Sequence, residues 1–195
     1  MSYELILVVA AYLLGSIPTG LVLARFFGGV DIRTAGSGNI GATNVSRTLG
    51  WKLGVLTLVG DCLKGLIPVL VAQRFGMTEG WLALTGFAAF AGHVYTVFLH
   101  FKGGKGVATA LGVFLGLSPW AVVAALAIFV LILWKWRYVS LASITAASAM
   151  PLLVAFLDGR GLIFLMTIAI ATLVVWRHRE NIQRLRSGAE NKFRG

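Results

Sequence analysis

The feature that most constrains this chain is a succession of apolar runs, each long enough to cross a bilayer, along nearly its whole length. A membrane-spanning helix needs about 17 to 25 mainly apolar residues. Hydrophobic residues make up 58% of the sequence and charged residues 12%, a composition that no soluble domain could cover with a wettable surface. The sequence therefore predicts an all-α integral membrane protein, formed by a single transmembrane domain over 1–195.

Seven spans are expected, at 3–24, 53–73, 80–100, 105–118, 119–134, 139–157 and 161–176, of which the fourth and the seventh are short. Basic residues in short loops stay on the cytoplasmic side of a membrane. With the N-terminus outside and the C-terminus in the cytoplasm, fourteen of the 17 Lys and Arg residues fall in inner segments, Arg74 and Arg160 fall outside, and Lys64 lies within a span. Because Glu4 precedes the first run and Arg25 follows it, we expect this run to be an uncleaved anchor, not a signal peptide.

A glycine-rich segment at 36–41, GSGNIG, has the spacing of a dinucleotide-binding fingerprint. That fingerprint requires a preceding strand, whereas an expected span precedes it here, so the dinucleotide interpretation fails. A glycine-rich segment can still turn its backbone N–H groups toward an anion. The candidate ligands are Gly36, Gly38 and Gly41, the uncharged donors Ser37, Asn39, Thr43 and Asn44, and the guanidinium of Arg47. The alternative is a tight turn whose glycines serve packing alone.

A second inner loop, FKGGKGVATALG at 101–112, places Gly103, Gly104 and Gly106 around Lys105 at the start of an expected span. It is not a nucleotide P-loop, because Leu99 and Gly106 stand where that motif requires Gly and Ser or Thr. A lysine in an amide-rich loop at a helix N-terminus suits a phosphate. The alternative, lysines that only set the topology, leaves the glycines unexplained.

The third inner segment, WRHRENIQRLRSGAENK at 176–192, contains His178 and Asn181 among several arginines. The arginines could simply lie on anionic lipid headgroups. A histidine can accept a proton near neutral pH, and its neighbour Glu180 could orient it, although a structural histidine is the alternative. We expect Ser140 and Ser143, after the fifth span, to lie at the same membrane face as the glycine-rich loops.

Ionisable residues within the expected spans form a separate group. Asp61 and Lys64 are three residues apart, on one helix face, and must face the bundle interior, either as a structural ion pair or in a direct catalytic role. His93 is expected to be an interior histidine with satisfied hydrogen bonds. The chain has no HExxH, CxxC, GxSxG or His-x4-Asp motif, and Cys62 is its one cysteine. We therefore expect no metal, no cofactor and no disulfide, and the positive charge that topology explains leaves no reason to expect nucleic acid.

Four stretches together resemble the bacterial membrane-integral acyl-phosphate:glycerol-3-phosphate acyltransferase family, over essentially the whole chain. They are SGNIGATNVSR at 37–47, GDCLKG at 60–65, GHVYTVFLHFKGGKGVA at 92–108 and HRENIQRLRSGAENK at 178–192. One departure is Thr96, where the family usually has proline. This departure bears on the shape of the span more than on activity, because it removes no polar group.

The resemblance implies transfer of a fatty acyl group from acyl phosphate to the 1-hydroxyl of glycerol 3-phosphate, which gives lysophosphatidic acid and phosphate. It also implies that the reaction needs no covalent acyl-enzyme and is the first acylation step of phospholipid synthesis. The implied location is the bacterial cytoplasmic membrane, with the active site facing the cytoplasm. The expected partners are glycerol 3-phosphate, acyl phosphate and membrane lipids, and we expect a monomer.

The family's residue roles are carried to the matching positions of this sequence. Glycerol 3-phosphate is assigned to Ser37, Asn39, Asn44, Arg47 and Asn181, and acyl phosphate with its developing charge to the backbone from Gly103 to Gly106 and to Lys105. Thr43 and Ser143 complete the binding set, and Lys105, His178, Ser37 and Arg47 form the catalytic set. The two loops could exchange substrates, and substrate phosphate rivals His178 as the general base.

Two other classes of function stay open at the level of the sequence. A carrier for phosphate-bearing solutes would place Asp61 and Lys64 along its path, but it also needs polar residues at both membrane faces. The outer loops offer little beyond Arg74, Glu79, Asp158 and Arg160, which favours an enzyme with access from one side. A noncatalytic partner in lipid synthesis would not need Lys105. A donor other than acyl phosphate, such as a carrier thioester, also stays open.

Overall fold

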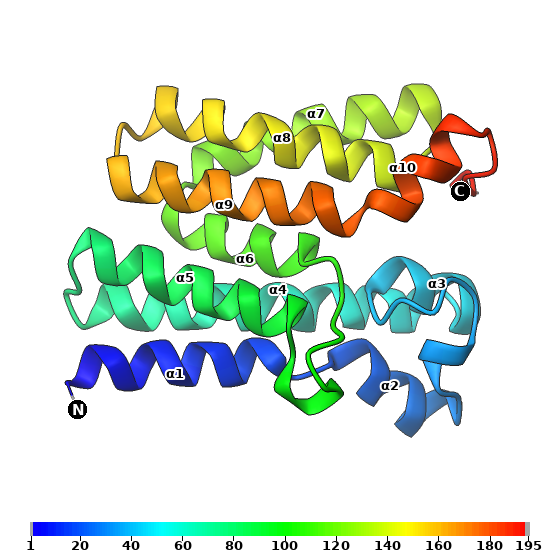
Figure 1. The fold of residues 1–195 in the computed structure, drawn as a ribbon, viewed down its shortest axis with the longest axis horizontal. Coiled ribbons are helices and arrows are strands. Elements are labelled where there is room, and N and C mark those ends of the chain that lie inside the picture. Colours follow the sequence, from blue (N-terminus) through cyan, green and yellow to red (C-terminus); the bar gives the residue numbers. More distant parts are fainter. Residues whose placement is uncertain (1, 194–195) are drawn as a thin grey trace. The chain divides into compact units, whose positions relative to one another are not determined.

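The computed structural model describes residues 2–193, which contain helices and no strands (Figure 1). They divide into two compact units after Gly116. The first unit contains α1 (Tyr3–Ser16), α2 (Thr19–Gly28), the 3-10 turn η1 (Ile32–Thr34), α3 (Ala42–Leu49), α4 (Trp51–Arg74), α5 (Glu79–Val94), the 3-10 turn η2 (Val97–Leu99) and α6 (Val107–Leu117). The second contains α7 (Pro119–Trp136), α8 (Val139–Leu157), α9 (Gly161–Arg177) and α10 (Arg179–Arg186).

The all-helical membrane fold is confirmed, but the expected number of spans is too high. Among the described residues, five segments are long and apolar enough to span: Tyr3–Gly28, Trp51–Arg74, Glu79–Leu99, Pro119–Trp136 and Val139–Leu157. A sixth is reached if α9 and α10, bent by 54°, count as one span. The expected fourth span is the helix α6 of 11 residues, which at 1.5 Å per residue covers about 17 Å of a hydrocarbon core about 30 Å thick. The orientation of the chain stays a prediction.

The first expected span, 3–24, is broken into α1 and α2 around Pro18. Proline cannot donate a backbone hydrogen bond, and the last carbonyls of a helix lack intrahelical partners. Two side chains from other elements supply these partners: Thr96 Oγ1 donates to the carbonyl of Ser16 at 2.5 Å, and Lys64 Nζ donates to that of Ile17 at 2.8 Å. Thr96 and Lys64 therefore help to stabilise the broken span.

Glycines bring the helices of the first unit into backbone contact. A Cβ atom at Gly15 or at Gly92 would overlap a carbonyl of the facing helix in the α1–α5 pair. Gly65 and Gly112 meet the facing backbone in the same reciprocal way between α4 and α6. Small residues at such positions let helices in lipid approach closely, where no hydrophobic force drives them together. The short helix α6 is thus attached firmly to α4, and α6 begins directly after the second glycine-rich loop.

In the second unit, polar contacts join the residues just before α7 to the loop between α8 and α9. The Ser118 hydroxyl donates to the Asp158 carboxylate, and the Arg160 guanidinium donates to the carbonyl of Leu117 and lies 3.5 Å from Asp158. These contacts satisfy polar groups at one end of the unit. The other end, where α8 begins and α9 meets α10 (Figure 1), holds the candidate site residues of this unit.

Candidate active site

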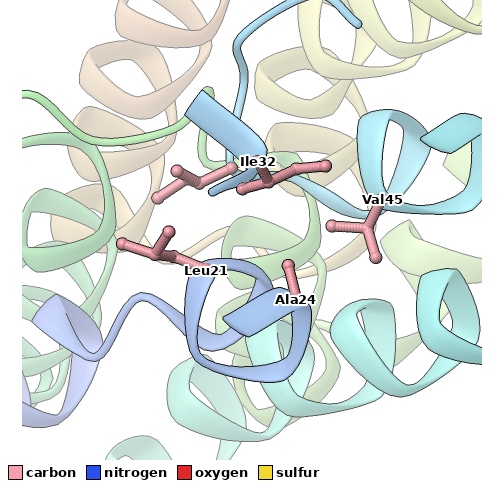
Figure 2. Close-up of a cluster of buried hydrophobic side chains, with 5 residues drawn as sticks. Leu21, Ala24, Ile32 and Val45 are labelled. Atoms are coloured by element: carbon pink, nitrogen blue, oxygen red, sulfur yellow. The ribbon is translucent and has the colours of Figure 1, made fainter. Parts of the chain in front are cut away.

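The first glycine-rich loop rests on a small buried cluster of apolar side chains. The cluster consists of Leu21 and Ala24 from α2, Ile32 from η1, Ile40 from the loop before α3, and Val45 from α3. Figure 2 shows Leu21, Ala24, Ile32 and Val45 converging. Ile32 and Ile40 stand on either side of segment 33–39. Burial of both anchors the two ends of the loop, while the polar residues between them stay accessible.

Asn44 holds the loop in shape through its side-chain amide. Its Oδ1 accepts from the backbone N–H of Ser37 at 2.8 Å, and its Nδ2 donates to the carbonyls of Asn39 at 2.8 Å and Ala35 at 3.0 Å. The residue is only 3% exposed. Gly36, at φ +59°, adopts the left-handed conformation, and a Cβ atom there would overlap Asn44 Oδ1. The side-chain amide of Asn44 thus fixes the loop backbone, and the substrate contact expected of Asn44 stays a prediction.

The remaining predicted residues of this loop present polar groups around the start of α3. Ser37, Thr43 and Arg47 are exposed, and Asn39 is half-buried with its Oδ1 accepting from Gly41 N at 2.8 Å. Thr43 and Arg47 are four residues apart in α3, so they share one helix face. Ser37, Asn39, Thr43 and Arg47 are thus exposed or half-buried polar residues of the loop and of helix α3.

An ion-paired cluster closes the connection between α2 and η1. Asp31 accepts from Arg33 Nη2 at 2.6 Å and Nε at 2.9 Å, and from Arg25 Nη2 at 2.9 Å. The hydrogen bonds from Arg33, and then those from Arg25, hold the pKa of Asp31 well below its ordinary value. Two of the inner-segment arginines are thereby used to fix the loop.

The second glycine-rich loop follows a strained turn and is tied to the end of α5. His100 and Phe101 have φ angles of +52° and +61°, an uncommon conformation for residues with side chains. The N–H groups of Gly103 and Gly104 donate to the carbonyls of Val94 and His93, each at 3.1 Å. Both amides thus donate to the protein's own backbone in this structure, and the phosphate cradle expected from Gly103 to Gly106 stays a prediction. Helix α6 begins at Val107, directly after this loop.

Three ionisable side chains lie buried beneath this second loop. Lys64 Nζ is 2.9 Å from Asp61 Oδ1, and His93 Nδ1 is 3.7 Å from the same oxygen. A Cβ atom at Gly104 would overlap His93 Nε2, so the imidazole packs directly on the loop backbone. The predicted interior pair is confirmed, and the contact of His93 with the loop is a feature that the sequence did not indicate.

In the second unit, His178 lies at the bend between α9 and α10. Its Nδ1 is 2.7 Å from the carbonyl oxygen of Val174. A carbonyl only accepts, so Nδ1 carries the hydrogen, and in the neutral ring the basic lone pair is on Nε2. Glu180, which we expected to orient the ring, is exposed on α10, and a backbone carbonyl orients His178 instead.

Glu190, which the sequence analysis did not identify, accepts hydrogen bonds from three polar side chains of the second unit. Its Oε1 accepts from Asn181 Nδ2 at 2.7 Å and from Ser140 Oγ at 2.8 Å, and its Oε2 accepts from Arg184 Nε at 2.8 Å. Ser143 is buried one turn further along α8 and does not share in these bonds. Burial raises the pKa of Glu190, but the bonds from Asn181, Arg184 and Ser140 outweigh it, so the pKa lies below its ordinary value.

The helical fold, the two glycine-rich loops with Arg47 and Lys105, and the polar end of the second unit define an integral membrane enzyme. A family model described as "Glycerol-3-phosphate acyltransferase" matches residues 5–188. The chain belongs to this glycerol-3-phosphate acyltransferase family.

Similar proteins cover the chain from end to end. Proteins called glycerol-3-phosphate acyltransferase from Geotalea daltonii and Geobacter sulfurreducens are 68% and 63% identical over 194 residues, which is 100% of each chain. A crystal structure of PlsY (YgiH), an integral membrane glycerol 3-phosphate acyltransferase, in its glycerol 3-phosphate form has a TM-score of 0.95 and 48% identity, over 99% of this chain and 96% of that one. The lysophosphatidic acid form of PlsY gives a TM-score of 0.91 and 49% identity over the same shares. Membership of an enzyme family sets the carrier and noncatalytic interpretations aside.

Proposed function

We propose that this chain transfers a fatty acyl group from acyl phosphate to the 1-hydroxyl of glycerol 3-phosphate, forming lysophosphatidic acid and releasing phosphate. The observation that carries the proposal is the match to a relative captured with glycerol 3-phosphate and with lysophosphatidic acid, the acceptor and the product of this reaction. The loops of the first unit support it, because they offer a guanidinium and an ammonium group for two phosphate-bearing substrates.

The chemistry requires orientation and charge stabilisation more than a nucleophile from the protein. The 1-hydroxyl oxygen of the acceptor attacks the acyl carbonyl carbon, the bond from that carbon to the phosphate oxygen breaks, and phosphate leaves with the electron pair. Acyl phosphate is a mixed anhydride and is already activated. The protein therefore has to align the two substrates and stabilise negative charge on the carbonyl oxygen and the leaving group, and no covalent acyl-enzyme forms.

We assign glycerol 3-phosphate to the surface formed by segment 37–47. The Arg47 guanidinium can bind a phosphate in bidentate fashion, and exposed Ser37 and Thr43 add hydroxyl donors. Half-buried Asn39 is assigned to the same substrate. Asn44 acts on the substrate through the loop shape, since its amide is already bonded to three backbone groups that belong to the loop.

We assign acyl phosphate to Lys105 and the start of α6. The N-terminus of a helix of 11 residues carries partial positive charge and unsatisfied N–H groups, which suit a phosphate. The ammonium group of half-buried Lys105 neutralises charge on the leaving phosphate. Gly103 and Gly104 serve the site by packing the loop closely onto α5.

The proton of the attacking hydroxyl goes to Nε2 of His178, with the phosphate group of the substrate as the rival acceptor. Hydrogen bonding of Nδ1 to Val174 fixes the tautomer that places the basic lone pair on Nε2. Asn181 and Ser143 complete the binding set in the second unit. We place the site at the cytoplasmic face, because the acceptor is a soluble cytosolic dianion and the inner segments contain fourteen of the 17 basic residues.

The test uses the purified protein reconstituted in lipid vesicles. Phosphate release and lysophosphatidic acid formation from glycerol 3-phosphate are measured with acyl phosphate, acyl-CoA and acyl-carrier protein as donors, with Lys105→Ala as the control. Product from acyl phosphate alone, strongly reduced in Lys105→Ala, supports the proposal. Product from a thioester alone keeps the acyltransferase activity and rejects the proposed donor.

A further inference from the structure

A buried ion pair lies within helix α4, beneath the second glycine-rich loop. The Nζ of Lys64 is 2.9 Å from Oδ1 of Asp61, and the two side chains are 4% and 3% exposed. A buried ion pair is often no more stabilising than apolar side chains of the same volume. Ionisable residues inside a membrane are costly and usually serve a function. Stability alone therefore explains this pair poorly.

The Lys64 end of the pair is fixed to the break between α1 and α2. Its Nζ also donates to the carbonyl of Ile17 at 2.8 Å, immediately before Pro18. One ammonium group thus holds α4 to the position where the first span changes direction. The pair has a defined place in the first unit because both of its ends have fixed neighbours.

The Asp61 end of the pair faces His93, near the C-terminus of α5. His93 Nδ1 lies 3.7 Å from Asp61 Oδ1, and the Nε2 edge of the ring lies where a Cβ atom of residue 104 would stand. The backbone carbonyl of His93 also accepts from the N–H of Gly104 at 3.1 Å. The loop at 101–106 therefore contacts His93 through both its ring and its backbone, next to Lys105.

We propose that Asp61, Lys64 and His93 are positioning residues of the acyl transfer reaction, which hold the 101–106 loop through Gly104 in the shape that places Lys105. This inference rests on the function proposed above and adds residues that touch neither substrate. The requirement for glycine at position 104 follows from the same contact, because any side chain there collides with the imidazole. The ion pair with Lys64 fixes the position of Asp61, which lies beside the His93 imidazole. The imidazole in turn packs against the backbone of Gly104 in the loop.

The first experiment compares His93→Ala with the wild-type protein in lipid vesicles. We expect kcat/KM for acyl phosphate to fall at least tenfold while KM for glycerol 3-phosphate changes by less than twofold. Hydrogen exchange of the amides in segment 101–106 should become at least tenfold faster, whereas segment 36–44 keeps its rates. A general loss of stability would affect both substrates and both segments alike.

A matched control removes a buried polar group from the same helix without touching the network. Thr85 in α5 is fully buried, and its hydroxyl has no hydrogen-bond partner among the described residues. Thr85→Val keeps the side-chain shape, so the kinetics for both substrates and the exchange rates of both segments should stay within twofold of wild type.

A second experiment uses the collision at position 104. Gly104→Ala should lower kcat/KM for acyl phosphate at least a hundredfold, because the new Cβ atom displaces the loop from the imidazole. Because the double variant Gly104→Ala/His93→Ala lacks the ring, its kcat/KM for acyl phosphate should be at least tenfold higher than that of Gly104→Ala. Such non-additivity requires direct contact between the two residues. Losses that simply multiply in the double variant overturn the inference.

The outcomes separate this inference from the proposed function. If wild-type protein turns over no acyl phosphate, the proposed donor is wrong, and the exchange rates of 101–106 in His93→Ala still decide about the positioning role. If wild-type protein is active and His93→Ala changes neither donor kinetics nor exchange, the inference is wrong. Should His93→Ala fail to fold, Asp61→Asn/Lys64→Met removes both charges together, and unchanged exchange in 101–106 with that variant overturns the inference equally.

Discussion

The side-chain amide nitrogen of Asn181 lies 2.7 Å from Oε1 of Glu190, nine residues further along the chain. Asn181 was expected to bind glycerol 3-phosphate, and in this structure a carboxylate holds its amide group. Ser140 and Arg184 donate to the same carboxylate, so the orientation of α10 depends on one acidic side chain that is 5% exposed. Loss of this carboxylate leaves three donors without their common acceptor.

Replacement of Glu190 by alanine should destabilise the protein by about 2 kcal/mol, because hydrogen bonds to a buried charged group are lost together. The turnover rate should fall at least tenfold, since the position of Asn181 is no longer fixed. Thermal unfolding in detergent and the vesicle assay measure the two effects. The matched control is Glu180→Ala, which removes an exposed acidic residue of α10, and neither quantity should change. Wild-type stability in Glu190→Ala would show that α10 does not depend on these bonds.

The pH dependence of stability follows from the lowered pKa of Glu190. The pKa in the folded state lies below the value near 4.3 of an unfolded chain. The stabilisation is therefore complete above about pH 4.3 and is lost as pH falls through the folded-state pKa. We expect the unfolding temperature to decrease as the pH falls below about 4.3, and to decrease less in Glu190→Gln. An equal decrease in both proteins would assign the acid sensitivity to other carboxylates.

Parts of this architecture follow directly from sequence periodicity and composition. The hydrophobic runs located the five described segments that are long and apolar enough to span a membrane, because burial in lipid demands a minimum apolar length, but they also predicted the short helix α6 as a span. The spacing of Asp61 and Lys64 predicted their ion pair, since residues three apart in a helix share a face. The glycines of 36–41 predicted a loop after the first span, and in the structure Gly36 and Gly38 of this loop have positive φ angles.

Other features depend on contacts between distant parts of the chain and leave little local signal. Ser140 and Glu190 are separated by 50 residues, so no periodic pattern could pair them. The hydrogen bonds from the Gly103 and Gly104 amides to the end of α5 depend on where that helix ends and on the path of the loop after it. The break at Pro18 did have a local signal, because proline disfavours a continuous helix, but the donors Thr96 and Lys64 that stabilise it lie far away in sequence.

Substitution of Arg47 should chiefly weaken the binding of the acceptor. Arg47 is exposed on α3, so Arg47→Ala should leave the unfolding temperature nearly unchanged and raise KM for glycerol 3-phosphate about a hundredfold, which corresponds to about 2.7 kcal/mol. Arg47→Lys keeps the charge and loses the planar fork, and about a tenfold rise in KM is expected. Steady-state kinetics at saturating acyl phosphate measure both. A normal KM in Arg47→Ala would move the acceptor away from segment 37–47.

Substitution of Asn44 should differ from that of Arg47 in its effect on stability. Asn44→Ala removes an acceptor and a donor group that bond the loop backbone, and buried backbone groups left unpaired cost about 1–3 kcal/mol. We expect a lower unfolding temperature together with weaker binding of glycerol 3-phosphate. Asn44→Asp keeps the acceptor for Ser37 but loses the donor for Asn39, and it should lie between alanine and wild type in unfolding temperature. If Asn44→Ala weakens binding without any loss of stability, Asn44 contacts the substrate directly.

The identity of the general base can be decided from the pH dependence of turnover. If Nε2 of His178 accepts the proton, kcat should increase with pH and reach a plateau once the imidazole is neutral. His178→Gln removes this base and should lower kcat by a factor of about 10² to 10⁴ and abolish the histidine limb of the profile. The hydrogen bond from Nδ1 to Val174 predicts a second result, because it fixes the tautomer. His178→Asn can still donate toward Val174 but offers no basic nitrogen, and it should be as slow as His178→Gln.

The rival proton acceptor predicts a different pattern. A base supplied by the phosphate group of glycerol 3-phosphate leaves the shape of the pH profile intact in both His178 variants, with a smaller and uniform decrease in kcat. Replacement of the substrate phosphate by a phosphonate, which has a higher second pKa, should then shift the pH profile of kcat to higher pH in wild type and variants alike. With His178 as the base, the same replacement leaves the wild-type limb where it was, so the two acceptors are distinguished by which change moves the profile.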